Sequence, residues 1–182
     1  MNVVATEING LFIVEPRIFE DNRGYFFESY NQAEFEKAGI KTRFLQDNQS
    51  KSEYGVIRGL HYQLMPQSQT KLVRVLEGSV YDVAVDLRKE SPDYKKWFGI
   101  ELSAENKKQL FIPKGFAHGF SVLTDYAVFH YKCDRLYNPE SERGILYSDN
   151  SLDIDWKIPL DKIIVSEKDI GLPAFDKADM NF

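Results

Sequence analysis

The stretch Gly59-Leu60-His61-Tyr62-Gln63 and, further along, Ile112-Pro113-Lys114-Gly115-Phe116-Ala117-His118-Gly119-Phe120 decide the fold predicted for this chain. Both are short, mostly apolar runs of the kind that form strands in a barrel. Each carries one histidine, His61 or His118, and Gln63 stands two residues after the first of them. Two imidazoles are fewer than the three or four donors that a divalent ion needs, so we expect no bound metal.

The order of these stretches resembles that of the two ligand-bearing motifs of cupin barrels. In metal-binding cupins the first motif supplies His-x-His and then a carboxylate. Here Gln63 replaces the second histidine, and the positive charge of Lys71 further along would repel a divalent ion. We therefore predict an all-β, cupin-type jelly-roll barrel with a few short helices, in which the cavity has kept its shape and changed its chemistry.

The rest of the chain supports an all-β fold. Short apolar or alternating runs recur at residues 11–14, 24–30, 56–63, 71–76, 80–87, 97–102, 109–112 and 117–132, separated by turn-forming residues. One early helix is predicted over residues 31–38, because Asn31 can cap it and Gly39 can stop it. Helical turns are predicted near residues 160–163 and 168–171. The segment from residue 150 onward contains Trp156 and several aliphatic residues, so we expect it to pack on the barrel.

Composition narrows the class of protein. With 182 residues, 43% of them hydrophobic, the chain is predicted to be one domain, residues 1–182. The net charge of -5 and the absence of a basic run argue against nucleic-acid binding. No run approaches the roughly 20 apolar residues of a membrane span, and residues 1–10 lack the pattern of a signal peptide. We expect a soluble, cytoplasmic protein, with its one cysteine, Cys133, as a buried structural thiol.

Strand alternation indicates which polar side chains can share the barrel interior, since successive residues point to opposite faces. His61 shares a face with Gln63, and Tyr131 shares one with Phe129, whereas His130 points the opposite way. Tyr131 is therefore a candidate for the cavity and His130 is not.

The run at residues 80–87 has two different faces. One face holds Asp82 and Asp86, which can be interpreted as residues of a solvated surface. The other face is predicted to be core, and its members are Tyr81, Val83, Val85 and Leu87.

A cavity that holds an imidazole, an ammonium and a phenol suits removal of a proton next to a carbonyl group. Histidine can take a carbon-bound proton when a carboxylate orients it, which makes His61 a candidate base. Lys71 can stabilise the developing enolate oxygen, and Tyr131 can return a proton on the opposite face. Removal on one face and return on the other invert a stereocentre, which is epimerisation.

Each of these residues also has a structural interpretation. A single strand histidine such as His61 is often only a hydrogen-bonded structural residue. A buried tyrosine such as Tyr131 often does no more than satisfy its hydroxyl, and a lysine such as Lys71 can extend its ammonium to solvent. The residues by themselves leave these alternatives open.

The chain closely resembles the dTDP-4-dehydrorhamnose 3,5-epimerase family of deoxysugar biosynthesis. The segments that carry the resemblance run in order along nearly the whole chain, at residues 15–17, 21–28, 46–48, 58–61, 71–73, 81–86, 112–120, 131–132, 137–142 and 166–169. Residues 64–70 and 133–136 differ from the forms typical of the family, which bears on contacts to the sugar.

The resemblance implies a metal-free cupin jelly roll that works as a homodimer, without a cofactor, on a dTDP-linked 4-keto-6-deoxyhexose. It implies that His61 is the base, Asp169 its dyad partner, Tyr131 the acid and Lys71 the stabiliser of the enolate. Because C3 and C5 both adjoin the C4 carbonyl, one base can serve both carbons. The implied substrate-binding residues are Arg23, Glu28, Gln46, Asp47, Asn48, Arg58, His118, Tyr137, Glu142 and Lys168, with Tyr137 stacked on thymine and the three cations near the phosphates.

The leading hypothesis is conversion of dTDP-4-dehydro-6-deoxy-D-glucose to dTDP-4-dehydro-L-rhamnose, in dTDP-L-rhamnose biosynthesis. Three alternatives stay open. The first is a mono-epimerase, at C3 or C5 only, or a ketoisomerase on a related nucleotide sugar. The second is a non-catalytic sugar-nucleotide binding module, and the third is a metal-dependent cupin.

Overall fold

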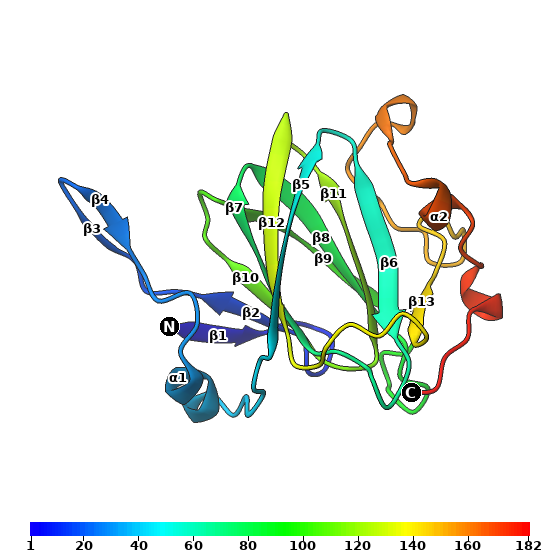
Figure 1. Cartoon of the computed structure of the whole chain (residues 1–182), viewed down its shortest axis with the longest axis horizontal. Helices are drawn as coiled ribbons and strands as arrows, with labels where there is room; N and C mark the ends of the chain where they lie inside the picture. Colours follow the sequence, from blue (N-terminus) through cyan, green and yellow to red (C-terminus); the bar gives the residue numbers. More distant parts are fainter.

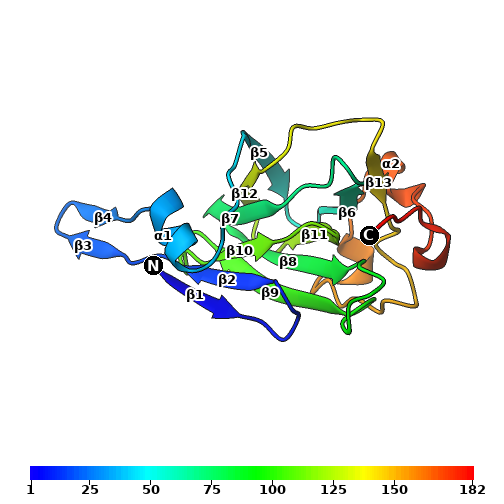
Figure 2. The same ribbon diagram turned by 90° about the horizontal axis from the view of Figure 1, so that it is seen from below.

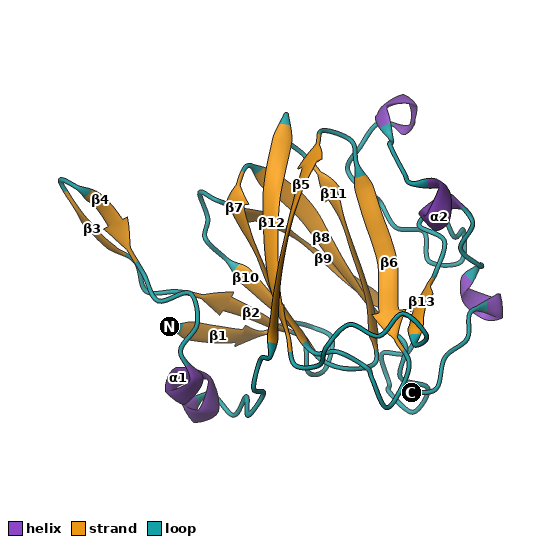
Figure 3. Ribbon diagram, viewed as in Figure 1, coloured by secondary structure: helices purple, strands orange, loops and turns teal.

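Two antiparallel β-sheets packed face to face form the body of the molecule in the computed structural model, which describes residues 1–182 (Figure 1). The six-stranded sheet has the order β1 (Asn2–Ala5), β2 (Phe12–Glu15), β10 (Gln109–Ile112), β7 (Lys71–Glu77), β12 (Tyr126–Cys133), β5 (Gln46–Glu53). The five-stranded sheet has the order β13 (Glu142–Gly144), β6 (Ile57–Gln63), β11 (Phe116–Val122), β8 (Ser79–Asp86), β9 (Trp97–Ser103). Strands dominate the chain (Figure 3), as predicted.

Two hydrophobic clusters hold the five-stranded sheet in place. Fourteen buried residues, among them Phe120 and Phe129, fill the space between the two sheets. A second cluster lies on the outer face of the five-stranded sheet, where Val83 and Val85 pack against Trp156 and Phe175. Both the predicted core face of residues 80–87 and the predicted packing of the C-terminal segment are thereby confirmed.

Several predicted strands need correction. The run at residues 117–132 is two strands, β11 and β12, because residues 123–125 turn the chain from one sheet to the other. In the run at residues 24–30 only β4 (Gly24–Phe26) is a strand. Four strands, β1, β3 (Phe19–Asp21), β5 and β13, were not predicted from the sequence. Of these, β5 is the most consequential, since it pairs along its whole length with β12.

The helices are short and lie outside the barrel. Helix α1 (Gln32–Lys37) is capped as predicted, because the side chain of Asn31 accepts hydrogen bonds from the N–H groups of Ala33 and Glu34. The predicted turns near the C-terminus are η1 (Leu160–Lys162) and α2 (Glu167–Ile170), and η2 (Phe175–Lys177) follows them. No helix is long and apolar enough to span a membrane.

A two-stranded hairpin extends away from the barrel (Figures 1 and 2). It consists of β3 (Phe19–Asp21) and β4, and we call residues 17–28 the arm. Its aromatic side chains are largely exposed: Phe19 is 50%, Tyr25 59% and Phe26 65% accessible. Apolar side chains held out from the body of a protein are typical of a surface that another chain covers.

Candidate active site

A cavity of about 640 Å³ opens between the two sheets. The five-stranded sheet contributes Ile57, Arg58, His61, His118 and Phe120 to its lining, and the six-stranded sheet contributes Asn48, Gln49, Ser50, Lys71, Phe129 and Tyr131. Val56 and residues of the C-terminal segment, Ile164, Val165, Ser166, Lys168 and Asp169, close one side. The cavity therefore collects side chains from both walls of the barrel.

His61 and Asp169 form a hydrogen-bonded dyad at this cavity. The Nε2 atom of His61 lies 2.7 Å from Oδ1 of Asp169, and the N–H of Gly59 donates to the other carboxylate oxygen at 3.3 Å. Ser166 caps helix α2 and so places Asp169 beside β6. Burial works to raise the pKa of Asp169, but the hydrogen bond and the charge of His61 outweigh it, so that this pKa lies below its ordinary value.

A second imidazole and carboxylate lie next to the dyad. His118 is the cross-strand neighbour of His61, and its Nε2 atom is 2.9 Å from Oδ2 of Asp82. Burial raises the pKa of Asp82 and lowers that of His118, while their mutual attraction opposes both shifts. Asp82 is fully buried, and so is Asp86, which binds Arg88. The interpretation of the two aspartates as residues of a solvated face is therefore wrong.

Lys71 and Tyr131 face the two histidines from the six-stranded sheet. They lie on the adjacent strands β7 and β12, and the Nζ atom of Lys71 is 5.8 Å from the centre of the Tyr131 ring. Burial lowers the pKa of Lys71, against the opposing charges of Asp82 and Glu142, and it raises the pKa of Tyr131, which favours the protonated phenol. The alternative in which Lys71 extends to solvent is wrong, because its side chain lines the cavity between the two sheets.

Glu142 joins two further predicted residues, Tyr137 and Lys168, of which Lys168 lines the cavity. Its Oε2 atom accepts hydrogen bonds from the hydroxyl of Tyr137, at 2.9 Å, and from Nζ of Lys168, at 2.7 Å. Burial opposes ionisation of Glu142, but these two hydrogen bonds lower its pKa. The three residues come from β13, from the loop before it and from helix α2, so that Glu142 connects three separate segments.

Outside the arm, four predicted substrate-binding residues remain, and two of them line the cavity. Arg58 and Asn48 line the cavity, and the Nε atom of Arg58 donates to the hydroxyl of Ser52 at 2.9 Å. Gln46 does not line it, and its amide binds the N–H of Tyr137 and the side chain of Asn48. Asp47 also lies outside the cavity, where its carboxylate pairs with Lys132 at 2.9 Å.

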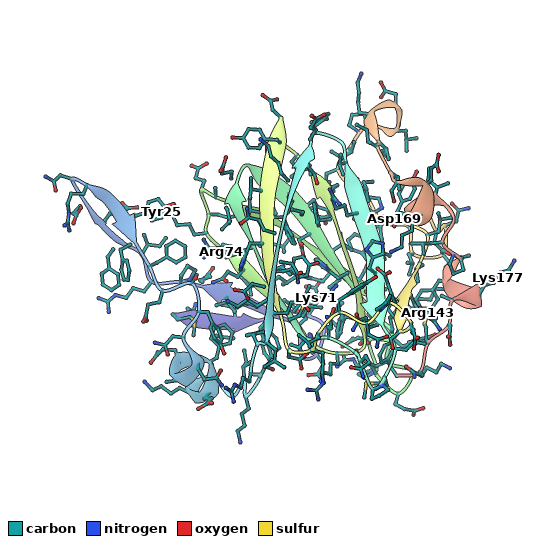
Figure 4. All side chains as sticks on the ribbon, viewed as in Figure 1. Tyr25, Lys71, Arg74, Arg143, Asp169 and Lys177 are labelled. Carbon is teal, nitrogen blue, oxygen red and sulfur yellow. The ribbon has the colours of Figure 1, made fainter.

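Arg23 and Glu28 do not reach the cavity within one chain. Both belong to the arm, where Arg23 pairs with Asp21 and Glu28 accepts a hydrogen bond from Asn31. Figure 4 shows the arm residue Tyr25 far from Lys71 and Asp169. One chain alone therefore does not assemble the whole predicted site.

Gln49, Ser50 and Asp82 belong to the site but were not predicted as site residues. Gln49 and Ser50 line the cavity from β5, a polar strand without a strand pattern. Asp82 is the partner of His118; its position opposite an apolar face was the available signal for an inward-pointing carboxylate. The placement of His130 outside the cavity, near Asp47, agrees with the prediction from strand alternation.

Comparison with known proteins identifies the family. The family model described as dTDP-4-dehydrorhamnose 3,5-epimerase matches residues 5–177. The chain belongs to the dTDP-4-dehydrorhamnose 3,5-epimerase family. Among curated relatives, the dTDP-4-dehydrorhamnose 3,5-epimerase of Shigella flexneri is 56% identical over 180 residues, which is 98% of each chain.

Solved structures agree with this membership. The dTDP-6-deoxy-D-glucose-3,5-epimerase of Legionella pneumophila, in complex with dTDP-4-keto-L-rhamnose, matches with a TM-score of 0.93 and 50% identity, covering 98% of this chain and 94% of that one. A 3'-monoepimerase of Streptomyces bikiniensis, in complex with dTDP-quinovose, matches with a TM-score of 0.87 and 30% identity, covering 94% and 86%. The predictions of the family, of the cupin-type all-β fold and of a sugar-nucleotide epimerase are confirmed.

Proposed function

We propose that this epimerase converts dTDP-4-dehydro-6-deoxy-D-glucose to dTDP-4-dehydro-L-rhamnose by proton transfer between the two walls of its cavity, with no cofactor. The observation that carries the proposal is the placement of the acid and the base. His61, with its partner Asp169, lies on the five-stranded sheet, and Tyr131 lies on the six-stranded sheet. A sugar ring between the sheets has one face toward each group.

The base acts first. The ionised carboxylate of Asp169 holds the proton of His61 on Nε2, which leaves the Nδ1 lone pair free to take a proton from C3 or C5. The electron pair of the broken C–H bond moves to the C4 oxygen, which gives an enolate. Asp169 then stabilises the imidazolium that forms.

Lys71 stabilises the enolate. The ammonium of Lys71 lies in a poorly solvated position, where a new negative charge within reach is attracted more strongly than in water. Tyr131 keeps its proton because its pKa is raised, and it donates that proton to carbon from the opposite face. Solvent then removes the proton from His61 and restores that of Tyr131, and the cycle repeats at the second carbon.

Deuterium incorporation tests this function. The protein is incubated with dTDP-4-dehydro-6-deoxy-D-glucose in deuterated water, with a reductase added to trap the product, and C3 and C5 are followed by NMR. Deuterium at both carbons with a rhamnose product supports the proposal. Deuterium at one carbon indicates a mono-epimerase, and movement of the ketone indicates a ketoisomerase. Absence of deuterium at both carbons indicates a non-catalytic binding module. Stoichiometric metal in elemental analysis contradicts the cofactor-free mechanism.

We further propose a homodimer in which the arm of one subunit reaches the cavity of the other. Three observations support it: the arm extends from the barrel, its aromatic side chains are exposed, and Arg23, a predicted phosphate ligand, is carried at its turn. A cytoplasmic location also remains part of the proposal, which agrees with Cys133 as a single, buried free thiol.

Subunit complementation tests the exchange of arms. The variants Arg23→Ala and His61→Ala are each expected to be impaired as homodimers. When their subunits are mixed and exchanged, half of the heterodimer's cavities combine an intact His61 with Arg23 of the partner subunit. Activity should then return to about a quarter of the wild-type value. Absence of recovery, with heterodimers demonstrated by native mass spectrometry, would show that each arm serves its own subunit or none.

A further inference from the structure

Gln63 occupies the position where a metal-binding cupin has a ligand, but its amide serves another purpose. The residue ends strand β6, two positions after His61, and is only 4% exposed. It does not line the cavity. Its Oε1 atom accepts a hydrogen bond from the N–H of Asn138 at 2.8 Å, and its Nε2 atom donates to the carbonyls of Gln67, at 2.6 Å, and Leu136, at 3.4 Å.

The loop that Gln63 binds, residues 134–141, connects β12 to β13 and carries Tyr137. The N–H groups of Tyr137 and Asn138 have no backbone acceptor. Each is bound by a glutamine side chain: Gln46 Oε1 accepts from Tyr137 at 2.9 Å, and Gln63 accepts from Asn138. Because Gln46 lies on β5 and Gln63 on β6, the loop is held from both sheets at once.

The same loop carries Tyr137, one of the two residues that Glu142 binds. Glu142 is the cross-strand partner of Gln63, and its carboxylate binds the hydroxyl of Tyr137 and the ammonium of Lys168. The Tyr137 side chain is otherwise open to solvent, since the residue is 53% exposed. Its backbone and its hydroxyl are therefore the two points that hold the ring.

We infer that Gln63 is a positioning residue for the nucleotide end of the substrate, acting through the loop that carries Tyr137. The inference rests on the proposed function and on the role that the family resemblance implies for Tyr137, which is to stack on thymine. An amide is suited to this position because it accepts from one N–H and donates to two carbonyls at once, which neither a carboxylate nor a neutral imidazole can do. Loss of Gln63 should weaken binding of the nucleotide and leave the proton transfers at His61 and Tyr131 intact.

The first test measures the split between binding and chemistry. Gln63→Met keeps the length of the side chain and removes all three hydrogen bonds, and it should raise KM and the dissociation constant of dTDP about tenfold, with kcat changed less than about threefold. Gln63→Glu keeps the acceptor for the N–H of Asn138 but places a carboxylate next to the carbonyls of Gln67 and Leu136. Because the two N–H donors are lost, we expect this variant to raise the dissociation constant of dTDP as much as Gln63→Met does. Circular dichroism and thermal unfolding show whether each variant is folded. If Gln63→Met does not fold, the binding and kinetic measurements are made on Gln63→Glu.

The second test separates action through Tyr137 from a general structural effect. In a Tyr137→Ala background, Gln63→Met should produce no further rise in the dTDP dissociation constant, because the ring that it positions is absent. Additive effects, or a loss of kcat with unchanged dTDP binding, would overturn the inference. Titration calorimetry with dTDP does not require turnover, so failure of the epimerase assay in the wild type would count against the proposed function and not against the role of Gln63.

Discussion

The two walls of the cavity differ in how their polar groups are held. On the five-stranded sheet, His61 and His118 each have a carboxylate partner within the chain, Asp169 and Asp82. On the six-stranded sheet, Lys71 and Tyr131 have no hydrogen-bond partner that shifts their pKa, and burial is the dominant influence on both. The histidines of the first wall are therefore paired with carboxylates of the same chain, whereas the polar groups of the second wall are free to bind the substrate.

This difference indicates how the work of epimerisation is divided. An imidazole with a buried carboxylate has its tautomer and orientation set before the substrate arrives, as a base requires. An unpaired ammonium and phenol in a poorly solvated site gain their strongest interaction only when negative charge develops on the substrate. We expect changes to the first wall to abolish proton removal, and changes to the second wall to weaken stabilisation of the enolate at Lys71 or return of the proton at Tyr131.

The largest expected effect comes from the paired wall. His61→Ala removes the base and should lower deuterium exchange at both C3 and C5 about a thousandfold or more. His130→Ala is the matched control, because His130 lies on the outer side of β12, and it should change the rate less than about twofold. Exchange at the wild-type rate in His61→Ala would show that His61 is not the base and that the paired wall does not carry out proton removal.

Lys71 tests the unpaired wall. Lys71→Met keeps the aliphatic part of the side chain and removes the charge that stabilises the enolate, so kcat should fall about a hundredfold. The matched control is Lys132→Met, since Lys132 pairs with Asp47 on the outer side of the same sheet. Steady-state kinetics of both variants decide the point: equal rates in the two would mean that the position of Lys71 in the cavity has no catalytic consequence.

Tyr131 separates proton removal from proton return. In Tyr131→Phe, exchange at the base should continue near the wild-type rate, while completed inversion should fall about tenfold to a hundredfold because the acid is missing. NMR of the trapped product in deuterated water measures both quantities in one sample. A parallel fall in exchange and inversion would assign Tyr131 to binding or to the first step.

The smallest expected effect is on stability at low pH. Because the pKa of Asp169 is lowered in the folded state, its contribution to stability is present above the ordinary carboxyl pKa, about 4, and is lost as pH falls through the lowered value. The free energy of unfolding of Asp169→Asn should therefore be below that of the wild type at pH 7, and the gap should narrow below about pH 4. Urea unfolding at several pH values measures this gap, and a gap that widens as pH falls has the wrong sign for an ionised Asp169.

Strand β5 shows where prediction from sequence stops. Its inward residues, Asn48 and Ser50 among them, are polar because they line the cavity and not a hydrophobic core. A strand pattern is visible in a sequence only when one of its faces is apolar, so the strand that contributes to the site lacks the signal. By contrast β6 and β12 were predicted, since apolar residues such as Leu60 and Phe129 pack beside their polar ones.

The sequence by itself determined the all-β fold and the family, and it made His61 and Tyr131 candidate residues of the cavity, because strand alternation and motif order are local properties of the chain. The family resemblance already implied the pair of His61 and Asp169, which the structure brings together across 108 residues. Only the tertiary structure decided that Asp82 pairs with His118, that Asp47 lies outside the cavity, and that the amide of Gln63 binds a loop. Such pairings depend on distances between segments remote in sequence, and these distances are set by the packing of the two sheets.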